Sequence, residues 1–198
     1  MFLDEPPDSA DATATQDSAR GSEGYVANFV RLWCWRPDLF HTFVDLRLAL
    51  MGSTTLSDRE QAIIVTATVS AMGDSYCSLA WGSKLAKLAG DETAAGVITG
   101  RIPDDLSARE SALAEWCRTV VRDPLATTAG EVAALRDAGF DDREIFEATL
   151  LLGLRLAFST VNDALGALPE QQVAEGAPAP VRDAVTFGRP AADHPSLT

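Results

Sequence analysis

The chain has 198 residues, enough for one domain with a hydrophobic core, and 46% of them are hydrophobic. It carries 16 basic and 29 acidic residues, a formal net charge of −13 at pH 7. This charge repels nucleic acid and anionic lipid, and it disfavours anionic substrates unless an arginine reverses the sign locally. We therefore expect neither a nucleic-acid nor a membrane partner.

The sequence also bears on the cellular compartment. Its start has neither the basic segment nor the apolar run of a secretory signal, and no stretch is apolar over the thickness of a bilayer. The three cysteines are too sparse for a disulfide framework and lack the spacing of a zinc site. We expect a cytoplasmic protein with reduced thiols and no metal.

Composition divides the chain into a core and two tails. Residues 1–20 are acidic, small and polar, which predicts a disordered tail. Residues 169–198 are rich in proline and poor in large apolar side chains, which predicts a second tail, either free or lying over a neighbouring subunit. The expected domain is therefore 21–168.

The signals within this domain are helical throughout, and no alternating run is long enough to predict a sheet, so we expect an all-α fold. Pro37 fits the first turn of a helix that runs to about Met51. Four further helix starts show a capping box, in which an N-cap side chain is followed three residues later by glutamate. They are Ser57 with Glu60, Ser107 with Glu110, Thr128 with Glu131, and Asp141 with Glu144.

Two of the expected helices, around 63–72 and 145–161, are apolar on nearly every side. Such helices are buried on most faces, which in a small domain suggests that neighbouring subunits help to cover them. The pattern Leu-Ser-x-Arg-Glu occurs at 56–60 and again at 106–110. An internal duplication and coincident capping chemistry explain this repeat about equally well.

The segment 56–90 predicts a buried helix, a turn at Gly73 and a second helix that starts near Asp74. It resembles the carboxymuconolactone decarboxylase and alkylhydroperoxidase D-like family, in its peroxidase-related branch. The pattern there is Leu-Ser-x-Arg-Glu, a buried helix, then Cys-x-Tyr-Cys-x-x-x-His-Gly, and Tyr76, Cys77 and Gly82 match it. Segments 24–52 and 138–170 resemble the family's upstream helix pair and closing helix.

This resemblance implies an alkylhydroperoxidase D-like helical domain that forms a homo-oligomer: a dimer, trimer or hexamer. It also implies a small-molecule substrate and no bound cofactor. The active-site motif nevertheless departs from the family pattern, because Asp74 stands at the first cysteine, Trp81 at the histidine and Ala62 at the usual glutamate. A dithiol peroxidase needs a second thiol to resolve the sulfenic acid, and Cys77 has no such partner in the motif.

Asp74 and Cys77 are the candidate catalytic residues. Asp74 suits the N-cap of the second helix, a purely structural role, or it acts as a general acid or base in the family's pocket. Cys77 is either a small buried thiol or a reactive one. The helix N-terminus favours its thiolate and the neighbouring carboxylate disfavours it, so the sequence does not give the sign of its pKa shift.

The candidate substrate-binding residues each have a structural alternative. Trp81 fills the core or shapes a pocket for a flat apolar molecule, and Tyr76 belongs to the matching motif. Lys84 reaches solvent or meets an anionic group at the pocket mouth, and His41 is a surface residue or faces the site. Arg155 interrupts the most apolar helix, so it pairs with an acidic side chain or anchors a substrate carboxylate.

Three functions remain open. The preferred one is a small-molecule enzyme without dithiol cycling, which carries out a decarboxylation, an isomerisation or another tailoring step with Asp74 as acid or base. The second is a single-cysteine peroxidase or redox sensor that uses Cys77. The third is a non-catalytic oligomeric binding protein.

Overall fold

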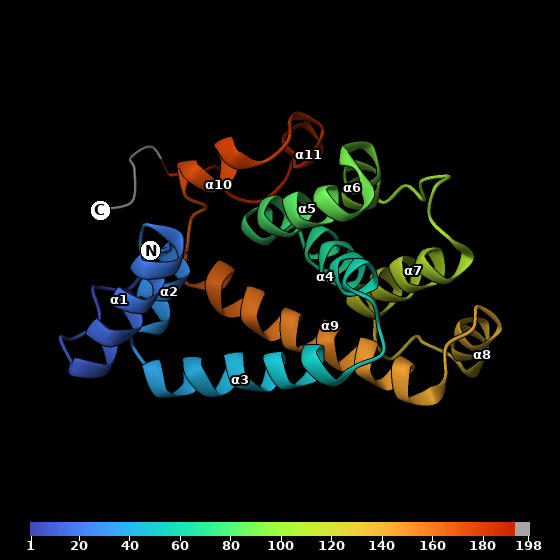
Figure 1. The fold of residues 1–198 in the computed structure, drawn as a ribbon, viewed down its shortest axis with the longest axis horizontal. Helices are drawn as coiled ribbons and strands as arrows, with labels where there is room; N and C mark the ends of the chain where they lie inside the picture. The colour runs from blue at the N-terminus through green and yellow to red at the C-terminus, as the bar shows by residue number, and fades with distance from the viewer. Residues whose placement is uncertain (193–198) are drawn as a thin grey trace.

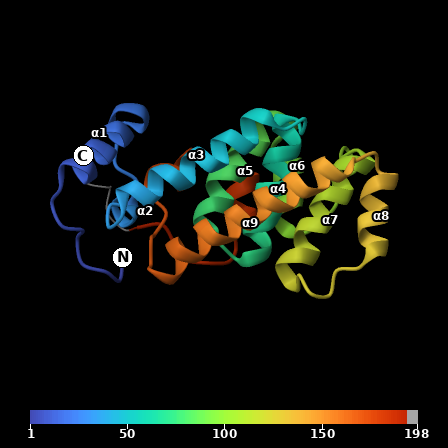
Figure 2. The same cartoon turned by 90° about the horizontal axis from the view of Figure 1, so that it is seen from below.

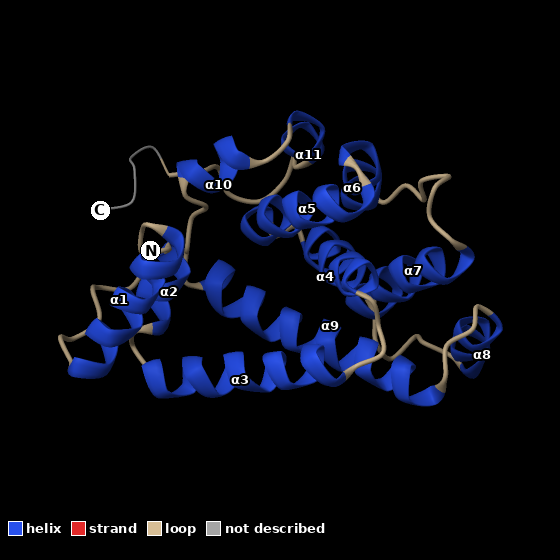
Figure 3. Cartoon of the chain, viewed as in Figure 1, coloured by secondary structure: helices blue, strands red, loops and turns tan. Residues whose placement is uncertain are grey.

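The structure is a computed structural model that describes residues 1–192; the end of the predicted proline-rich tail, 193–198 with His194, lies outside the described residues. Residues 1–192 form eleven helices and no strand, which confirms the predicted all-α class (Figures 1 and 3). The helices are α1 (Ala10–Glu23), α2 (Asn28–Trp33), α3 (Pro37–Ser53), α4 (Asp58–Met72), α5 (Ser75–Ala89), α6 (Asp91–Thr99), α7 (Ala108–Arg122), α8 (Ala129–Asp137), α9 (Asp142–Ala164), α10 (Gln171–Gly176) and α11 (Ala179–Ala184). No helix in this part of the chain has both the length and the apolarity needed to cross a membrane.

Helix α4 lies at the centre of the fold. Every side chain from Glu60 to Val69 is buried, because α5, α6, α7 and α9 all pack against this helix. The apolar pattern predicted this burial and suggested that neighbouring subunits contribute to it. In the structure, helices of the same chain bury α4. Helix α9 is less enclosed: Phe146 near its start is 65% exposed.

Local sequence chemistry sets the helix ends. All four predicted capping boxes are present, at the starts of α4, α7, α8 and α9. Helix α4 ends at Gly73, whose φ of 80° is the left-handed conformation that glycine adopts without a steric penalty. This turn brings Asp74 directly to the start of α5.

The segment 1–20 differs from its expected disorder, because helix α1 begins at Ala10. Ser9 caps the helix by accepting a hydrogen bond from the amide of Ala12. Ala12 and Thr15 are buried, and Ala12 packs in a small apolar cluster with Val26 and Val30. Polar composition alone therefore misleads here, since a short helix with one narrow apolar stripe can be held by capping and packing.

The described part of the C-terminal segment also packs on its own chain. Val181 of α11 is fully buried, and α10 and α11 lie against α5 and α6 (Figure 1). Beyond α11 the chain returns to the α4–α5 turn, where the Ser75 hydroxyl donates to the carbonyl of Arg189 at 2.7 Å. Gly188 lies so close to the Gly73 carbonyl that a Cβ there would approach it to 2.7 Å. These residues cover the start of α5.

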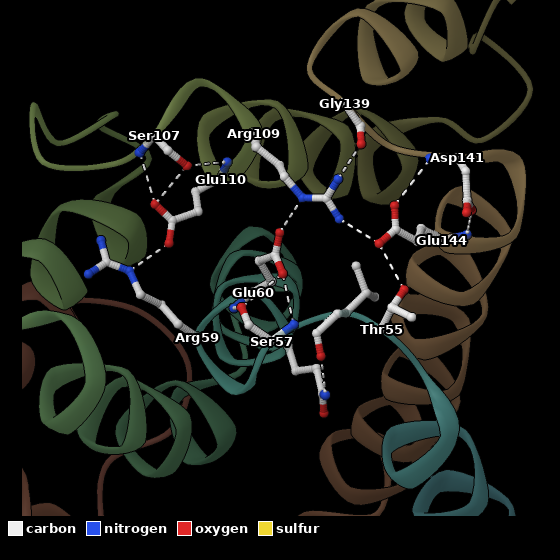
Figure 4. A network of polar contacts seen from close by, with 12 residues as sticks. Thr55, Ser57, Arg59, Glu60, Ser107, Arg109, Glu110, Gly139, Asp141 and Glu144 are labelled. Atoms are coloured by element: carbon white, nitrogen blue, oxygen red, sulfur yellow. Dashed lines mark hydrogen bonds and ion pairs between the residues drawn. The ribbon is translucent and has the colours of Figure 1, made fainter.

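The two copies of Leu-Ser-x-Arg-Glu face one another at the starts of α4 and α7 (Figure 4). Arg59 Nε lies 2.6 Å from Glu110 Oε1, and Arg109 Nε lies 2.5 Å from Glu60 Oε1. Each arginine thus pairs with the capping glutamate of the other copy. Arg109 also contacts Glu144 of the α9 capping box at 2.7 Å. The network ties three helix starts together.

Candidate functional site

A cavity of about 610 Å³ lies between helices α1, α2, α3, α5 and α9, with Val173 of α10 at its edge. Its volume is in the range of small-molecule sites. Much of its wall is aromatic: Tyr25, Phe29, Phe40, Phe43, Tyr76, Trp81 and Phe158. Figures 1 and 2 show α1 and α2 gathered at one end of the pair formed by α3 and α9, and in Figure 1 these two helices spread apart toward that end.

Several aromatic rings pack together on one side of the cavity. Phe158 of α9 stacks on Trp33 at a centroid distance of 5.5 Å and on Phe43 at 5.9 Å. Phe29 meets Phe158 edge-on at 5.4 Å. Behind them, Trp33 donates its indole N–H to Asn162 at 2.9 Å, which fixes the ring plane. Such a surface suits a flat apolar molecule.

Cys77 lies in the first turn of α5 and lines the cavity. Its Sγ is 3.5 Å from Nη1 of Arg155 and 3.8 Å from Oγ of Ser159. Burial raises the pKa of the thiol, and the Asp74 carboxylate raises it further, whereas Arg155 acts in the opposite direction. The net shift is upward, so the resting side chain is a thiol at neutral pH. Sequence reasoning had left the sign of this shift open.

Asp74 is the N-cap of α5, as predicted: its Oδ1 accepts the amide proton of Cys77 at 2.9 Å. The residue is 1% exposed and does not line the cavity. Its other oxygen, Oδ2, is buried and has no hydrogen-bond partner among residues 1–192. The structure therefore connects Asp74 to the cavity through Cys77, whose amide it holds and which does line the cavity.

Arg155 lines the cavity and is 7% exposed. Its guanidinium carbon lies 5.3 Å from the Trp81 ring centroid and 5.0 Å from that of Phe158. The sequence left open a pair with an acidic side chain, but the described residues provide none within ion-pair distance. Among the described residues, its guanidinium contacts the thiol of Cys77 and the rings of Trp81 and Phe158.

Arg47 of α3 also lines the cavity and was missed by the sequence analysis. Its Nη1 donates to Sδ of Met51 at 3.5 Å. Burial lowers the pKa of Arg47, and the charge of Arg155 lowers it further. A signal was present in the sequence, because Phe40, Phe43 and Arg47 share one helix face at the spacing i, i+3, i+7.

The remaining predicted residues are placed as follows. Trp81 and His41 line the cavity, and His41 Nε2 is 2.9 Å from Oγ1 of Thr15 on α1. Tyr76 presents its ring to the cavity. Lys84 does not line it; its Nζ lies 4.6 Å from the Trp81 ring centroid.

The Tyr76 hydroxyl is hydrogen-bonded to a buried acidic side chain. It donates to the carboxylate of Glu170, which is fully buried and also accepts the backbone amide of Asn28 at the start of α2. Burial raises the pKa of Glu170, although both hydrogen bonds oppose this. Glu170 was not predicted, because it lies where the sequence indicated a tail. It joins α2, α5 and the C-terminal segment beside the cavity.

The described residues offer neither a second sulfur at this site nor a metal centre. Cys34 and Cys117 are free and buried, and neither lines the cavity with Cys77. Across residues 1–192, no group of three or more His, Cys, Asp or Glu side chains is placed to hold a metal ion.

The architecture and this cavity define a protein with the helical fold of the alkylhydroperoxidase D core. An uncharacterized peroxidase-related protein with that core, from Ralstonia eutropha JMP134, superposes with a TM-score of 0.76 at 22% identity, over 87% of this chain and 93% of the other. A peroxidase-related protein from Silicibacter sp. TM1040 gives 0.76 at 20% identity, over the same shares. The resemblance inferred from the motif is thereby confirmed for the fold.

A third solved structure, the debrominase Bmp8, superposes with a TM-score of 0.74 at 15% identity, over 93% of this chain and 98% of that one. A Bmp8 variant with one cysteine changed to alanine, solved in complex with 2,3,4-tribromopyrrole, gives 0.71 at 15% identity, over 93% and 96%. No protein-family model and no curated protein matches the chain. At these identities the likeness establishes the fold alone.

Proposed function

We propose that this protein is an enzyme that transforms a small, flat and largely apolar molecule, with Cys77 as its single reacting thiol. One observation carries the proposal: Cys77 lines an aromatic-walled cavity, and Nη1 of Arg155 lies 3.5 Å from its Sγ. A thiol becomes a strong nucleophile when it loses its proton, and an adjacent cation stabilises the resulting thiolate.

The surroundings of Cys77 support a division of roles. Asp74 Oδ2, which is buried and has no hydrogen-bond partner among the described residues, is a suitable acceptor for the thiol proton. Arg155 would then donate its Nη1 hydrogen to the thiolate, and Ser159 would donate a second hydrogen bond. Asp74 as a general acid or base in direct contact with substrate is less well supported, since it does not line the cavity.

Two alternatives are less well supported. A single-cysteine peroxidase needs a thiolate in the resting state, whereas burial and Asp74 raise the pKa of Cys77. A non-catalytic scaffold would be favoured by a pocket filled by Trp81, but the cavity remains open beside that ring. The complex of a variant of the debrominase Bmp8 with 2,3,4-tribromopyrrole adds halogenated heteroaromatic rings to the compounds worth testing.

The test is turnover of a panel of flat electrophiles, including bromopyrroles, in the presence of an external thiol. Intact-protein mass spectrometry would follow adducts on Cys77. We expect Cys77→Ser to abolish turnover, while Cys117→Ser, which removes a buried thiol outside the cavity, preserves it. Turnover that survives Cys77→Ser would reject the proposal. Oxidation of Cys77 by peroxide alone would favour the peroxidase alternative.

A cytoplasmic homo-oligomer remains part of the proposal. Leu46 and Leu48 of α3 are 49% and 54% exposed, and Phe146 of α9 is 65% exposed, which leaves apolar surface along this helix pair. Light scattering on the purified protein would give the number of subunits.

A further inference from the structure

Two cations face the same cavity without an acidic partner in the part of the chain that the structure describes. Arg47 on α3 and Arg155 on α9 both line it, and neither lies within ion-pair distance of a carboxylate among residues 1–192. The acidic residue in the cavity lining, Glu23 at the end of α1, pairs with neither of them. Elsewhere in the protein the partly buried Arg59 and Arg109 are matched to glutamates.

This arrangement is costly, above all for Arg155, which is 7% exposed, whereas Arg47 is half-buried. A guanidinium removed from water is normally paired, because burying an uncompensated charge carries a large free-energy cost. The two arginines also repel each other, and this repulsion together with burial lowers the pKa of Arg47. In a chain with a net charge of −13, two cations for which residues 1–192 provide no acidic partner form a site of locally reversed charge.

We propose that Arg47 and Arg155 together bind the carboxylate of a flat aromatic or unsaturated acid, whose ring lies against the aromatic wall of Phe43 and Phe158. The inference rests on the proposed function in taking this cavity as the substrate site, and it names the substrate class. An anion between the guanidinium groups satisfies both charges at once, and the planar fork of arginine matches a carboxylate.

The placement of Arg155 gives this binding a consequence for the thiol. Its guanidinium contacts Cys77 Sγ at 3.5 Å, so a carboxylate held by Arg155 brings the attached ring close to the sulfur. A bound carboxylate also neutralises part of the positive charge of Arg155. This charge lowers the pKa of Cys77, whereas the charge of Asp74 raises it. Arg155 is therefore both a binding residue for the acid and a positioning residue for Cys77.

The experiment compares 2-naphthoate with the uncharged, nearly isosteric 2-naphthamide by isothermal titration calorimetry at pH 7.5. We expect the wild-type protein to bind the acid about tenfold tighter than the amide, or better, as two charge-assisted contacts require. Arg47→Gln and Arg155→Gln should each remove most of this preference while leaving amide binding within a few-fold. The matched control is Arg118→Gln, a partly buried arginine outside the cavity that donates to the Val97 carbonyl, and it should keep the preference.

Two further variants separate the possible failures. Cys77→Ser should keep the preference for the acid, because anion binding does not need the thiol. If this variant loses turnover but still prefers the acid, the loss concerns the proposed role of the thiol and not the proposed binding of the acid. Arg47→Lys, which keeps the charge, should retain part of the preference even if Arg155→Gln does not fold. Equal affinity of the wild type for acid and amide, or an unchanged preference in Arg47→Gln, would overturn the inference.

Discussion

Arg155 and Cys77 lie 78 residues apart in the sequence, yet the structure brings Nη1 of the arginine to 3.5 Å from Sγ of the cysteine. The contact joins the middle of α9 to the first turn of α5. It sets the arginine, which favours the thiolate, against Asp74 and burial, which favour the thiol. The reactivity of Cys77 should therefore respond in opposite directions to changes at these two charged residues.

Removing the positive charge of Arg155 should slow the alkylation of Cys77. In Arg155→Met the pKa of Cys77 rises further, because the group that lowers it is gone. We expect alkylation of Cys77 by iodoacetamide to be about tenfold slower at pH 8.5, since one pKa unit is a tenfold change in thiolate. Peptide mass spectrometry against time would give the rate. Arg118→Met is the control, and an unchanged rate in Arg155→Met would contradict the electrostatic link.

Removing the carboxylate of Asp74 should speed the alkylation of Cys77. Asparagine caps helices about as well as aspartate, so Asp74→Asn keeps the bond to the Cys77 amide while deleting the charge. The pKa of Cys77 then falls, and alkylation at pH 8.5 should be about tenfold faster. Turnover should fall, since the proton acceptor is lost. A variant that is slower in both assays would indicate a damaged helix start rather than the proposed roles.

Asp163, near the end of α9, should be a source of instability at neutral pH. Burial and the charge of Asp74 raise its pKa from 3.8 to about 6, with Arg189 opposing them. Between pH 3.8 and about 6 the folded state keeps a proton on this carboxyl group that the unfolded state has already lost. The free energy of unfolding therefore falls as pH rises from about 4 to 6. Because the side chain is only partly buried, Asp163→Asn should gain about 1 kcal/mol at pH 7.5 and little at pH 4.

Urea denaturation of Asp163→Asn at the two pH values would measure this. The control is Asp137→Asn, an exposed aspartate that also lies in the last turn of a helix. It shares any effect of the helix dipole but not the burial. Equal gains for the two variants would assign the effect to the helix end.

The network at the helix starts should make the fold sensitive to acid. Burial alone would raise the pKa values of Glu60 and Glu144, but their hydrogen bonds, chiefly those from Arg109, outweigh it and the net shift is downward. Lowered carboxyl pKa values stabilise the fold above about 4.5, and this contribution is lost as pH falls below that value. Arg109→Ala should cost about 2–3 kcal/mol at pH 7, because it leaves two partly buried carboxylates without their cation.

Chemical denaturation of Arg109→Ala between pH 3.5 and 7.5 would test this, with the deficit shrinking towards the acid end. Arg136→Ala, which breaks an exposed pair with Asp142, is the matched control and should leave stability nearly unchanged. A deficit that is constant with pH would show that packing on Phe140, whose ring lies 3.6 Å from the arginine, carries the effect instead.

Local chemistry made much of the fold predictable. The capping boxes, the turn at Gly73 and the N-cap at Asp74 depend on residues three or four positions apart, and each is found where the sequence placed it. The cavity required contacts that no local pattern encodes. Most of helix α1 was assigned to a tail because its segment is polar, and Glu170 was assigned to a tail because it lies in a proline-rich segment. Arg47 was overlooked although it shares a helix face with Phe43.

The exchange of glutamates between the two Leu-Ser-x-Arg-Glu copies has a consequence for local unfolding. Arg59 and Arg109 each hold the carboxylate that caps the other's helix, so the first turns of α4 and α7 lose their charge partners together when either one frays. Amide hydrogen exchange should accordingly report one shared opening free energy for the two helix starts, far apart in the chain but released as a single cooperative unit.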